Sequence, residues 1–113
     1  MDINGANPPL LMVHGWGGSH QETWQNTGVE QLINDAGTTV IGVDLLGHGT
    51  SEKPHDPSNY ADISAPIRKA IGARSTGVDA VGFSLGAIAL IDAALHNPKY
   101  FRKLMLVGIG NGL

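Results

Sequence analysis

A serine stands between two glycines at residues 82–86 (Gly-Phe-Ser-Leu-Gly), where one apolar run ends and a longer one begins. The apolar residues 78–81 and 85–95 on either side predict a buried strand, a tight turn and a helix. Such a turn leaves no room for side chains two residues away on either side, and Gly82 and Gly86 carry none. The turn would raise the Ser84 oxygen above the sheet and aim the first N–H groups of the helix at it.

A serine in this position is known as a nucleophile elbow, and it attacks carbonyl carbons. The alternative is an ordinary turn in which Ser84 only caps the helix. Because the chain has 16 glycines, the short pattern alone also arises by chance. The strand–turn–helix context favours the nucleophile.

The composition narrows the classes of protein. The length of 113 residues fits one domain, which we place at residues 1–113. The net charge of −3 shows no excess of basic residues of the kind that binds nucleic acid. The chain has no cysteine, so it has no disulfide and no thiolate metal site. The N-terminus lacks an apolar signal core, and no stretch reaches the ~20 apolar residues that span a membrane. We therefore expect a cytoplasmic protein without membrane, metal or cofactor.

Strands and helices alternate along the chain. We expect strands at Leu10–Val13, Thr39–Val43, Val78–Phe83 and Lys103–Val107. We expect helices at about Gln21–Ala36, around Ile63–Ile71 and at Leu85–Asn97, the last apolar nearly all round and therefore buried. For the second helix, Ser64 is a possible cap and Pro66 lies near the first turn.

This alternation predicts an α/β fold with a parallel sheet and right-handed crossovers. Ligands of such sheets bind beyond the carboxyl ends of the strands. His14, Asp44 and Ser84 each fall at such an end, so three polar residues share one rim.

Three segments resemble motifs of the α/β-hydrolase family, in its order and at its spacings. Residues 11–18 (Leu-Met-Val-His-Gly-Trp-Gly-Gly) resemble its His-Gly turn, residues 44–51 (Asp-Leu-Leu-Gly-His-Gly-Thr-Ser) its D-x-x-G-x-G-x-S loop, and residues 81–86 its elbow. The resemblance covers Leu10 to Gly110. It implies a minimal three-layer sandwich of about four parallel strands, in the order second-first-third-fourth, with about three helices.

The resemblance also implies roles. Ser84 would be the nucleophile, and the backbone N–H groups of Trp16 and Leu85 would form an oxyanion hole, worth a few kcal/mol per donor. Gly15 and Gly17 would let the backbone approach the substrate. Asp44 in this family usually pins its own loop.

The pattern departs from the family after Ser84, where an acid and then a histidine should complete the triad. The only such residues here are Asp92 and His96, and His96 lies roughly 18 Å along the helix that Ser84 begins. The acid and base expected of the family are therefore missing. The remaining candidates for the base are His48 first, then His14 and His20, with His55 also on a loop. Each has a structural alternative, as a residue of a turn or a solvated loop.

Asp44 is the best placed candidate acid, with Asp56 and Glu22 as alternatives. Asn111 and the terminal carboxylate of Leu113 follow the fourth strand and are further candidates to lie near the cleft. Trp16, Trp24 and Tyr60 are candidates to line an apolar pocket, although Trp24 also suits a helix-to-core anchor.

These observations predict a hydrolase of small or activated carboxylic esters, acting through an acyl-enzyme on Ser84 without a cofactor. Amides, which need a proton donor, should not react. The alternatives are a non-catalytic remnant that binds ligands or oligomerises, and a truncated product without activity.

The second and fourth strands would be sheet edges, which invite pairing with another chain. Charged residues make up 15% of the chain against a usual share of about 25%. We therefore expect a homo-oligomer, in the simplest case a two-fold dimer built on an edge or on uncovered helix faces.

Overall fold

A computed structural model of the chain describes residues 8–49, 53, 61–72 and 77–108. Several residues singled out in the sequence lie outside the described residues, namely His55, Asp56, Tyr60, Asn111 and Leu113. Their predicted places therefore stay predictions.

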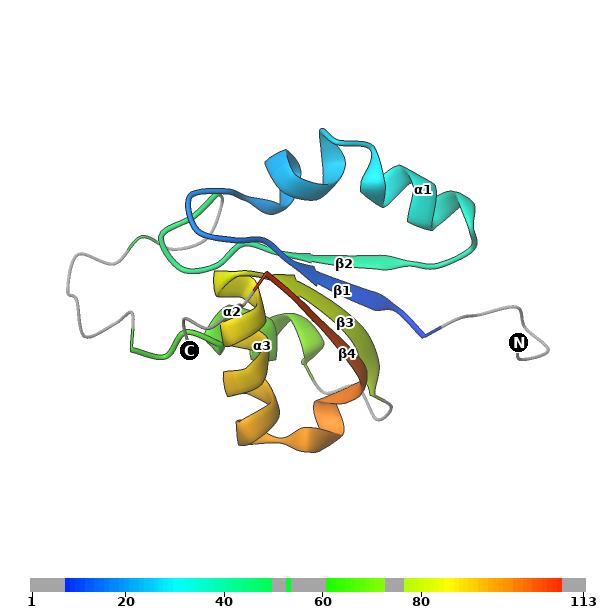
Figure 1. Cartoon of the computed structure of the whole chain (residues 1–113). Helices are drawn as coiled ribbons and strands as arrows, with labels where there is room; N and C mark the ends of the chain where they lie inside the picture. Colours follow the sequence, from blue (N-terminus) through cyan, green and yellow to red (C-terminus); the bar gives the residue numbers. More distant parts are fainter. Residues whose placement is uncertain (1–7, 50–52, 54–60, 73–76, 109–113) are drawn as a thin grey trace.

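Four parallel strands form one sheet in the order β2-β1-β3-β4 (Figure 1). They are β1 (Leu10–Val13), β2 (Val40–Val43), β3 (Val78–Phe83) and β4 (Phe101–Val107). Leu10 lies opposite Val40 on one side and Asp79 on the other, so the inner strand β1 has both of its edges paired. The predicted fold class and strand order are confirmed.

Helices cover both faces of the sheet and make three layers (Figure 1). One face carries α1 (Val29–Asp35) and a π-helical turn, η1 (Gln21–Gln25). The other face carries α2 (Ala65–Ile71) and α3 (Leu85–His96), and a 3-10 turn, η3 (Pro98–Tyr100), joins α3 to β4. No helix within the described ranges is both long and apolar enough to cross a membrane.

Some predicted boundaries are wrong. The single helix expected over residues 21–36 is two pieces, because Gly28 takes a φ of 84°, where a right-handed helix cannot continue. Strand β2 begins one residue later than expected, at Val40, and β4 two residues earlier, at Phe101. Pro66 lies in the first turn of α2 as expected, but Ser64 makes no side-chain cap and accepts a hydrogen bond from Arg68 Nε instead.

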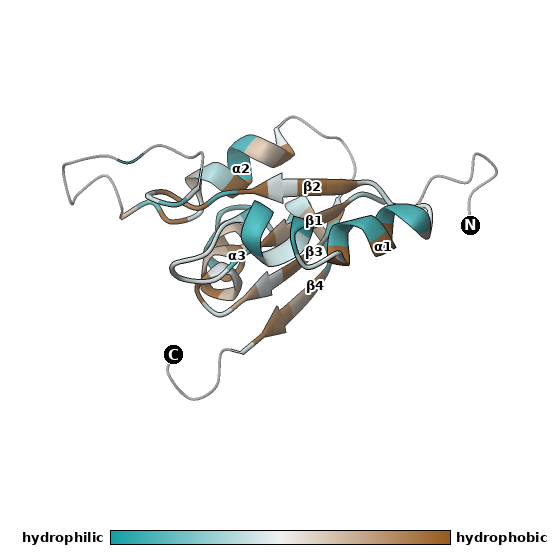
Figure 2. Cartoon of the chain, turned by 90° about the horizontal axis from the view of Figure 1, so that it is seen from above, coloured by the Kyte–Doolittle hydropathy of each residue, from teal (hydrophilic) through white to brown (hydrophobic). Residues whose placement is uncertain are grey.

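The core lies mainly between the sheet and the α2–α3 layer. Its members are the buried apolar side chains of β1, the end of β2, β3, α2 and α3, among them Leu11, Val13, Val43, Leu45, Ile67, Ile71, Val78, Leu90 and Ala93. Helix α3 is not buried all round, since Ile88 is 38% exposed and Leu95 80% exposed. The second half of β4, residues 104–107, is hydrophobic and yet open to solvent, with Met105 63% exposed (Figure 2).

Candidate active site

The backbone of Ser84 is strained. Its φ of 57° and ψ of −113° make it the one residue other than glycine with a positive φ in the described part of the chain. It stands between the last residue of β3 and the first of α3, and its N–H donates to the Val107 carbonyl at 2.8 Å. Strain of this kind persists only where the surroundings enforce it, and it gathers at functional sites.

The flanking glycines are required by contact. A Cβ on Gly82 would lie 2.7 Å from the Gly86 carbonyl oxygen and 2.8 Å from the Ala87 nitrogen. A Cβ on Gly86 would lie 2.5 Å from the carbonyl oxygens of Val13 and His14. Real Cβ atoms do not approach backbone this closely, so the elbow presses α3 against the end of β1 in a way that only glycine allows.

The His-Gly turn lies against the elbow. A Cβ on Gly15 would come 3.5 Å from the Ser84 Cβ and 3.2 Å from the Phe83 carbonyl oxygen. Leu85 begins α3, and the first N–H groups of a helix have no intrahelical acceptor. Among the described residues no acceptor pairs with the amide of Trp16 or Leu85, and the Trp16 side chain is 80% exposed. The loop after β1 and the start of α3, which carry the predicted oxyanion donors, therefore meet beside Ser84.

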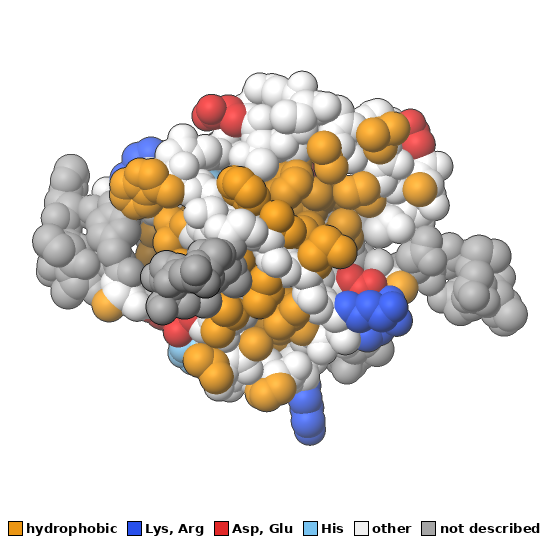
Figure 3. All heavy atoms as spheres, viewed as in Figure 1, with side chains coloured by type: hydrophobic (Ala, Val, Ile, Leu, Met, Phe, Trp, Pro, Cys, Tyr) orange, Lys and Arg blue, Asp and Glu red, His pale blue; other side chains and the backbone are white. Residues whose placement is uncertain are grey.

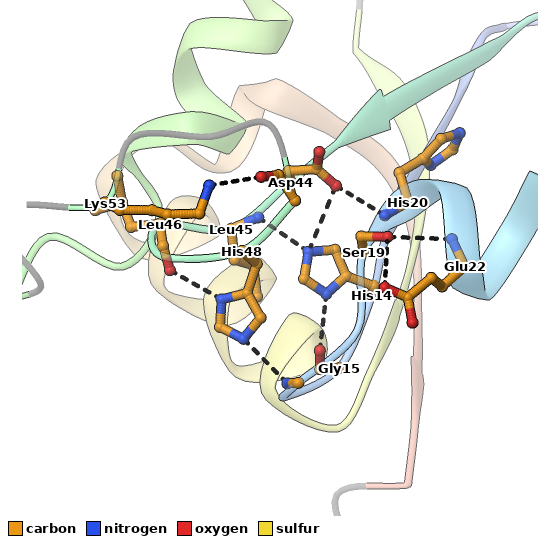
Figure 4. A network of polar contacts seen from close by, with 12 residues as sticks. His14, Gly15, Ser19, His20, Glu22, Asp44, Leu45, Leu46, His48 and Lys53 are labelled. Atoms are coloured by element: carbon orange, nitrogen blue, oxygen red, sulfur yellow. Dashed lines mark hydrogen bonds and ion pairs between the residues drawn. The ribbon is translucent and has the colours of Figure 1, made fainter.

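His14 is fully buried and has both ring nitrogens occupied (Figure 4). Its Nε2 accepts the Leu45 N–H at 3.0 Å, and its Nδ1 lies 2.7 Å from the Gly15 carbonyl oxygen. Burial lowers the pKa of His14, because the imidazolium would lose its hydration. His14 is thus a neutral residue that ties its own turn to the loop after β2.

His48 also has both nitrogens occupied. Its Nε2 accepts the Gly17 N–H at 3.0 Å, and its Nδ1 lies 2.9 Å from the Leu46 carbonyl oxygen (Figure 4). The ring stands 5.2 Å from the His14 ring and 5.3 Å from the Trp16 ring, measured between centroids. This geometry does not support the base role predicted for either His14 or His48, because neither ring has a free lone pair.

His20 makes a pair that the sequence did not reveal. Its Nε2 lies 2.7 Å from Glu30 Oε1, and this hydrogen bond is the main cause that lowers the pKa of Glu30. The ring packs against β2, where a Cβ on Gly42 would lie 2.7 Å from it. Glu22, the partner considered from sequence, instead accepts from Ser19 Oγ at 3.5 Å while its N–H donates to that oxygen. His20 Nδ1 is buried without a hydrogen-bond partner among the described residues, and no hydrogen bond or ion pair there joins His20 to Ser84.

Asp44 fastens the rim. Its Oδ1 accepts the backbone N–H of His20 at 2.8 Å and lies 3.8 Å from His14 Nε2. The carboxylate also fills the space in which Gly49 would carry a side chain. These contacts hold the loops together. None of them is a hydrogen bond from Asp44 to a histidine that is itself placed to act on Ser84.

The acid and histidine that follow Ser84 lie at the far end of α3. His96 Nδ1 is 2.9 Å from the Asp92 carbonyl oxygen and 3.6 Å from Asp92 Oδ2. Asp62 lies close enough for all three side chains to share a cation, but Arg68 already pairs with Asp62. This cluster is remote from the elbow and forms a charged helix end.

An apolar groove of about 490 Å³ lies on the face of the sheet that carries α1 and η1, between α1 and β4. Figure 3 shows hydrophobic side chains gathered over this area. The lining residues come from β1, η1, α1, β3 and β4, and include Met12, Trp24, Val29, Ile33, Val81 and Met105. Trp24 therefore lies in this groove, whereas Trp16 stands at the rim beside His48. The two tryptophans do not line one pocket.

A parallel β2-β1-β3-β4 sheet with a strained serine between β3 and a following helix defines the class of α/β hydrolases. A model of the alpha/beta hydrolase fold matches residues 8–112, and the chain belongs to that family.

Two of the curated relatives carry names of hydrolytic enzymes. The chain is 34% identical over 107 residues to a pyrrolizixenacetamide deacetylase of Xenorhabdus hominickii, covering 94% of this chain and 39% of that protein. It is 33% identical over 105 residues to a pimeloyl-[acyl-carrier protein] methyl ester esterase of Vibrio atlanticus, covering 93% and 38%.

Solved structures agree in fold. The thioesterase domain from the curacin biosynthetic pathway is 28% identical with a TM-score of 0.75, over 88% of this chain and 37% of that one. A polyneuridine aldehyde esterase mutant, at 22% identity and a TM-score of 0.72 over 88% and 39%, supports the fold alone. The chain therefore spans about two fifths of the length of these proteins.

Proposed function

We propose that the chain carries the nucleophile and oxyanion hole of a serine hydrolase that cleaves carboxylic esters. The strained backbone of Ser84, at the switch from β3 to α3, is the observation that carries the proposal. Membership of the alpha/beta hydrolase family and relatives named as an esterase and a deacetylase support it.

In the proposed reaction, the Ser84 oxygen attacks the ester carbonyl carbon and forms a new C–O bond. The hydroxyl proton passes to water, and the charge on the carbonyl oxygen is held by the amides of Trp16 and Leu85. The intermediate collapses, the bond to the leaving alkoxide or phenoxide breaks, and the acyl group stays on Ser84. Water then attacks the acyl-enzyme and releases the acid and the free serine.

The substrates that fit best are activated esters. His14 and His48 have both ring nitrogens in hydrogen bonds, His20 binds Glu30 through Nε2, and His96 binds Asp92 at the far end of α3. Within the described residues no hydrogen bond joins a histidine to Ser84, so we assign the proton of Ser84 to water. A phenoxide leaves without protonation, whereas an amine does not. An oxyanion hole with binding alone can still retain roughly 10³–10⁴-fold acceleration over water.

The test is hydrolysis of p-nitrophenyl acetate and p-nitrophenyl butyrate by the chain and by Ser84→Ala. We expect release of p-nitrophenol that Ser84→Ala lacks, and no cleavage of p-nitroacetanilide. Equal rates for the two proteins would remove the esterase and leave a ligand-binding role. Ser19→Ala serves as a control for serine removal on the same rim, since its hydroxyl is engaged with Glu22.

For the partner, we propose a second copy of this chain, paired through β4. The strand is seven residues long, its outer edge is unpaired among the described strands, and Leu104, Met105 and Leu106 are exposed. A two-fold axis perpendicular to the sheet and centred on Leu104 would pair the strands antiparallel. It would set Lys103 opposite Met105, so that no like charges face each other.

Sedimentation velocity tests this proposal. We expect a dimer that Met105→Lys dissociates, because the new ammonium group would lie opposite the partner's Lys103. Leu95→Lys is the matched control, since Leu95 is an exposed leucine on α3, away from β4. A monomer at high concentration, or equal dissociation by both variants, would contradict the proposed interface.

A further inference from the structure

Two imidazoles join the loop after β1 to the loop after β2 in a reciprocal pattern (Figure 4). His14, from the first loop, accepts the N–H of Leu45 in the second. His48, from the second loop, accepts the N–H of Gly17 in the first. Each ring points its other nitrogen at a carbonyl of its own loop, that of Gly15 for His14 and that of Leu46 for His48.

The partners fix the protonation state of both rings. A backbone N–H can only donate, so each Nε2 must present a lone pair. The proton of each neutral ring is then on Nδ1, where it donates to the carbonyl oxygen 2.7 Å away for His14 and 2.9 Å away for His48. Both rings are therefore neutral in this arrangement, and each has its donor and its acceptor in use.

We propose that His48 is a positioning residue for the oxyanion hole, an inference that rests on the proposed function. Its lone pair holds the Gly17 amide, and its ring face packs edge-on with the Trp16 indole. Gly17 has a φ of 78°, and no described atom lies within 4 Å of where its Cβ would be. The preceding peptide, which carries the Trp16 N–H, is held at its Gly15 carbonyl by the Gly18 N–H at 3.2 Å and by His14 Nδ1 at 2.7 Å. The His48 hydrogen bond adds the hold on the next peptide, between Trp16 and Gly17, and so completes the positioning of the Trp16 N–H.

The role differs from that of a base in what it requires. A base must exchange a proton, whereas a positioning residue needs only an acceptor at the place of Nε2. Glutamine carries an acceptor oxygen about as far along the side chain as Nε2 but cannot take up a proton. Asparagine is too short to reach that place and retains only the Leu46 side of the contact. These two variants, with alanine, separate the roles.

Two readouts are measured on His48→Gln, His48→Asn and His48→Ala. The first is exchange of the Gly17 amide hydrogen by NMR, which reports the hydrogen bond whether or not Ser84 is active. The second is kcat and KM for p-nitrophenyl acetate. His96→Ala is the matched control, because His96 is an exposed histidine at the far end of α3.

We expect His48→Ala and His48→Asn to raise Gly17 exchange and lower kcat, each roughly fivefold to tenfold, with KM within about twofold. His48→Gln should restore both values to within about twofold of the parent chain. Should His48→Ala fail to fold, His48→Asn gives the same comparison.

Unchanged Gly17 exchange in both short variants would overturn the proposal. A His48→Gln variant that protects Gly17 and yet is as slow as His48→Ala would also overturn it, in favour of a base. If Ser84→Ala hydrolyses the ester as fast as the parent chain, the proposed function fails, and the exchange measurement alone then decides whether His48 fixes this loop.

Discussion

The rim of the sheet and its β4 side are built on opposite principles. At the rim, His14, His48 and Asp44 join the loops after β1 and β2 through hydrogen bonds between residues 24 to 31 positions apart. On the β4 side, an apolar groove and a seven-residue edge strand lie open to solvent.

The contrast is between a rim that is held together by hydrogen bonds within the chain and a β4 side whose apolar surface is exposed. The contacts described above for the elbow and the His-Gly turn join residues of this one chain. The groove and β4 instead present apolar surface of the kind that marks protein–protein contact. Substitutions at the rim should therefore alter folding and chemistry, whereas those on β4 should alter association.

The largest effect on stability is expected at the elbow. Gly86→Ala would put a Cβ 2.5 Å from two carbonyl oxygens of β1 and the His-Gly turn, and we expect a loss of about 3 kcal/mol in the free energy of unfolding. Urea denaturation measures it. Gly28→Ala is the control, because Gly28 has a positive φ but a Cβ there would meet no described atom within 4 Å. This substitution should lower the free energy of unfolding by only about 1 kcal/mol. Equal costs would show that close approach at the elbow is not what requires glycine.

A smaller loss is expected from His14→Ala. The substitution leaves the Leu45 N–H without its acceptor and opens a space in a fully buried site, at a cost of about 2 kcal/mol. The same denaturation series measures it. If the variant were as stable as the parent chain, the rim would not be held together by this ring.

The pH dependence of stability follows from the same residue. Burial holds the pKa of His14 below its ordinary value of 6.5, so the unfolded chain binds this proton more readily than the folded one. This contribution to stability is complete above about pH 6.5 and declines as the pH falls below it. Thermal denaturation between pH 8 and pH 5 tests the sign. Compared with the parent chain, His14→Gln should lose less stability over this range, and His96→Ala should lose as much.

The smallest effect on stability is expected on β4. Met105→Lys replaces a side chain that is 63% exposed, so the free energy of unfolding of the isolated chain should change by less than about 0.5 kcal/mol. Denaturation at a concentration below that of association measures it. A loss comparable to that of His14→Ala would mean that β4 belongs to the chain's own core.

The fold was predictable because its signals are local and repeated. The apolar runs of β1 and β3 and the glycines at Gly82 and Gly86 each indicate the same strand–turn–helix order, and the structure agrees. The break at Gly28 was missed because the apolar spacing of Val29, Leu32 and Ile33, which all follow it, was extended backwards to Gln21 as one helix. The asparagine, threonine and glycine at residues 26–28 are the turn signal that would have revealed it.

The partners of the histidines were not predictable in this way. Most of their hydrogen bonds run to backbone groups, which leave no trace in side-chain identity. His14 and His48 each bond to a backbone N–H 31 residues away, and such a register appears only once the loops are placed on the sheet. Glu30 pairs with His20 because the turn at Gly28 carries α1 beside it, and the continuous helix expected from sequence obscured this pair.

The most direct test of the proposed nucleophile is covalent labelling. The chain, Ser84→Ala and Ser19→Ala are incubated with a fluorophosphonate, and the intact masses and the modified peptide are read by mass spectrometry. The account predicts one adduct on Ser84 in the parent chain and in Ser19→Ala, and none in Ser84→Ala. An unlabelled parent chain, or an adduct that persists without Ser84, would contradict it.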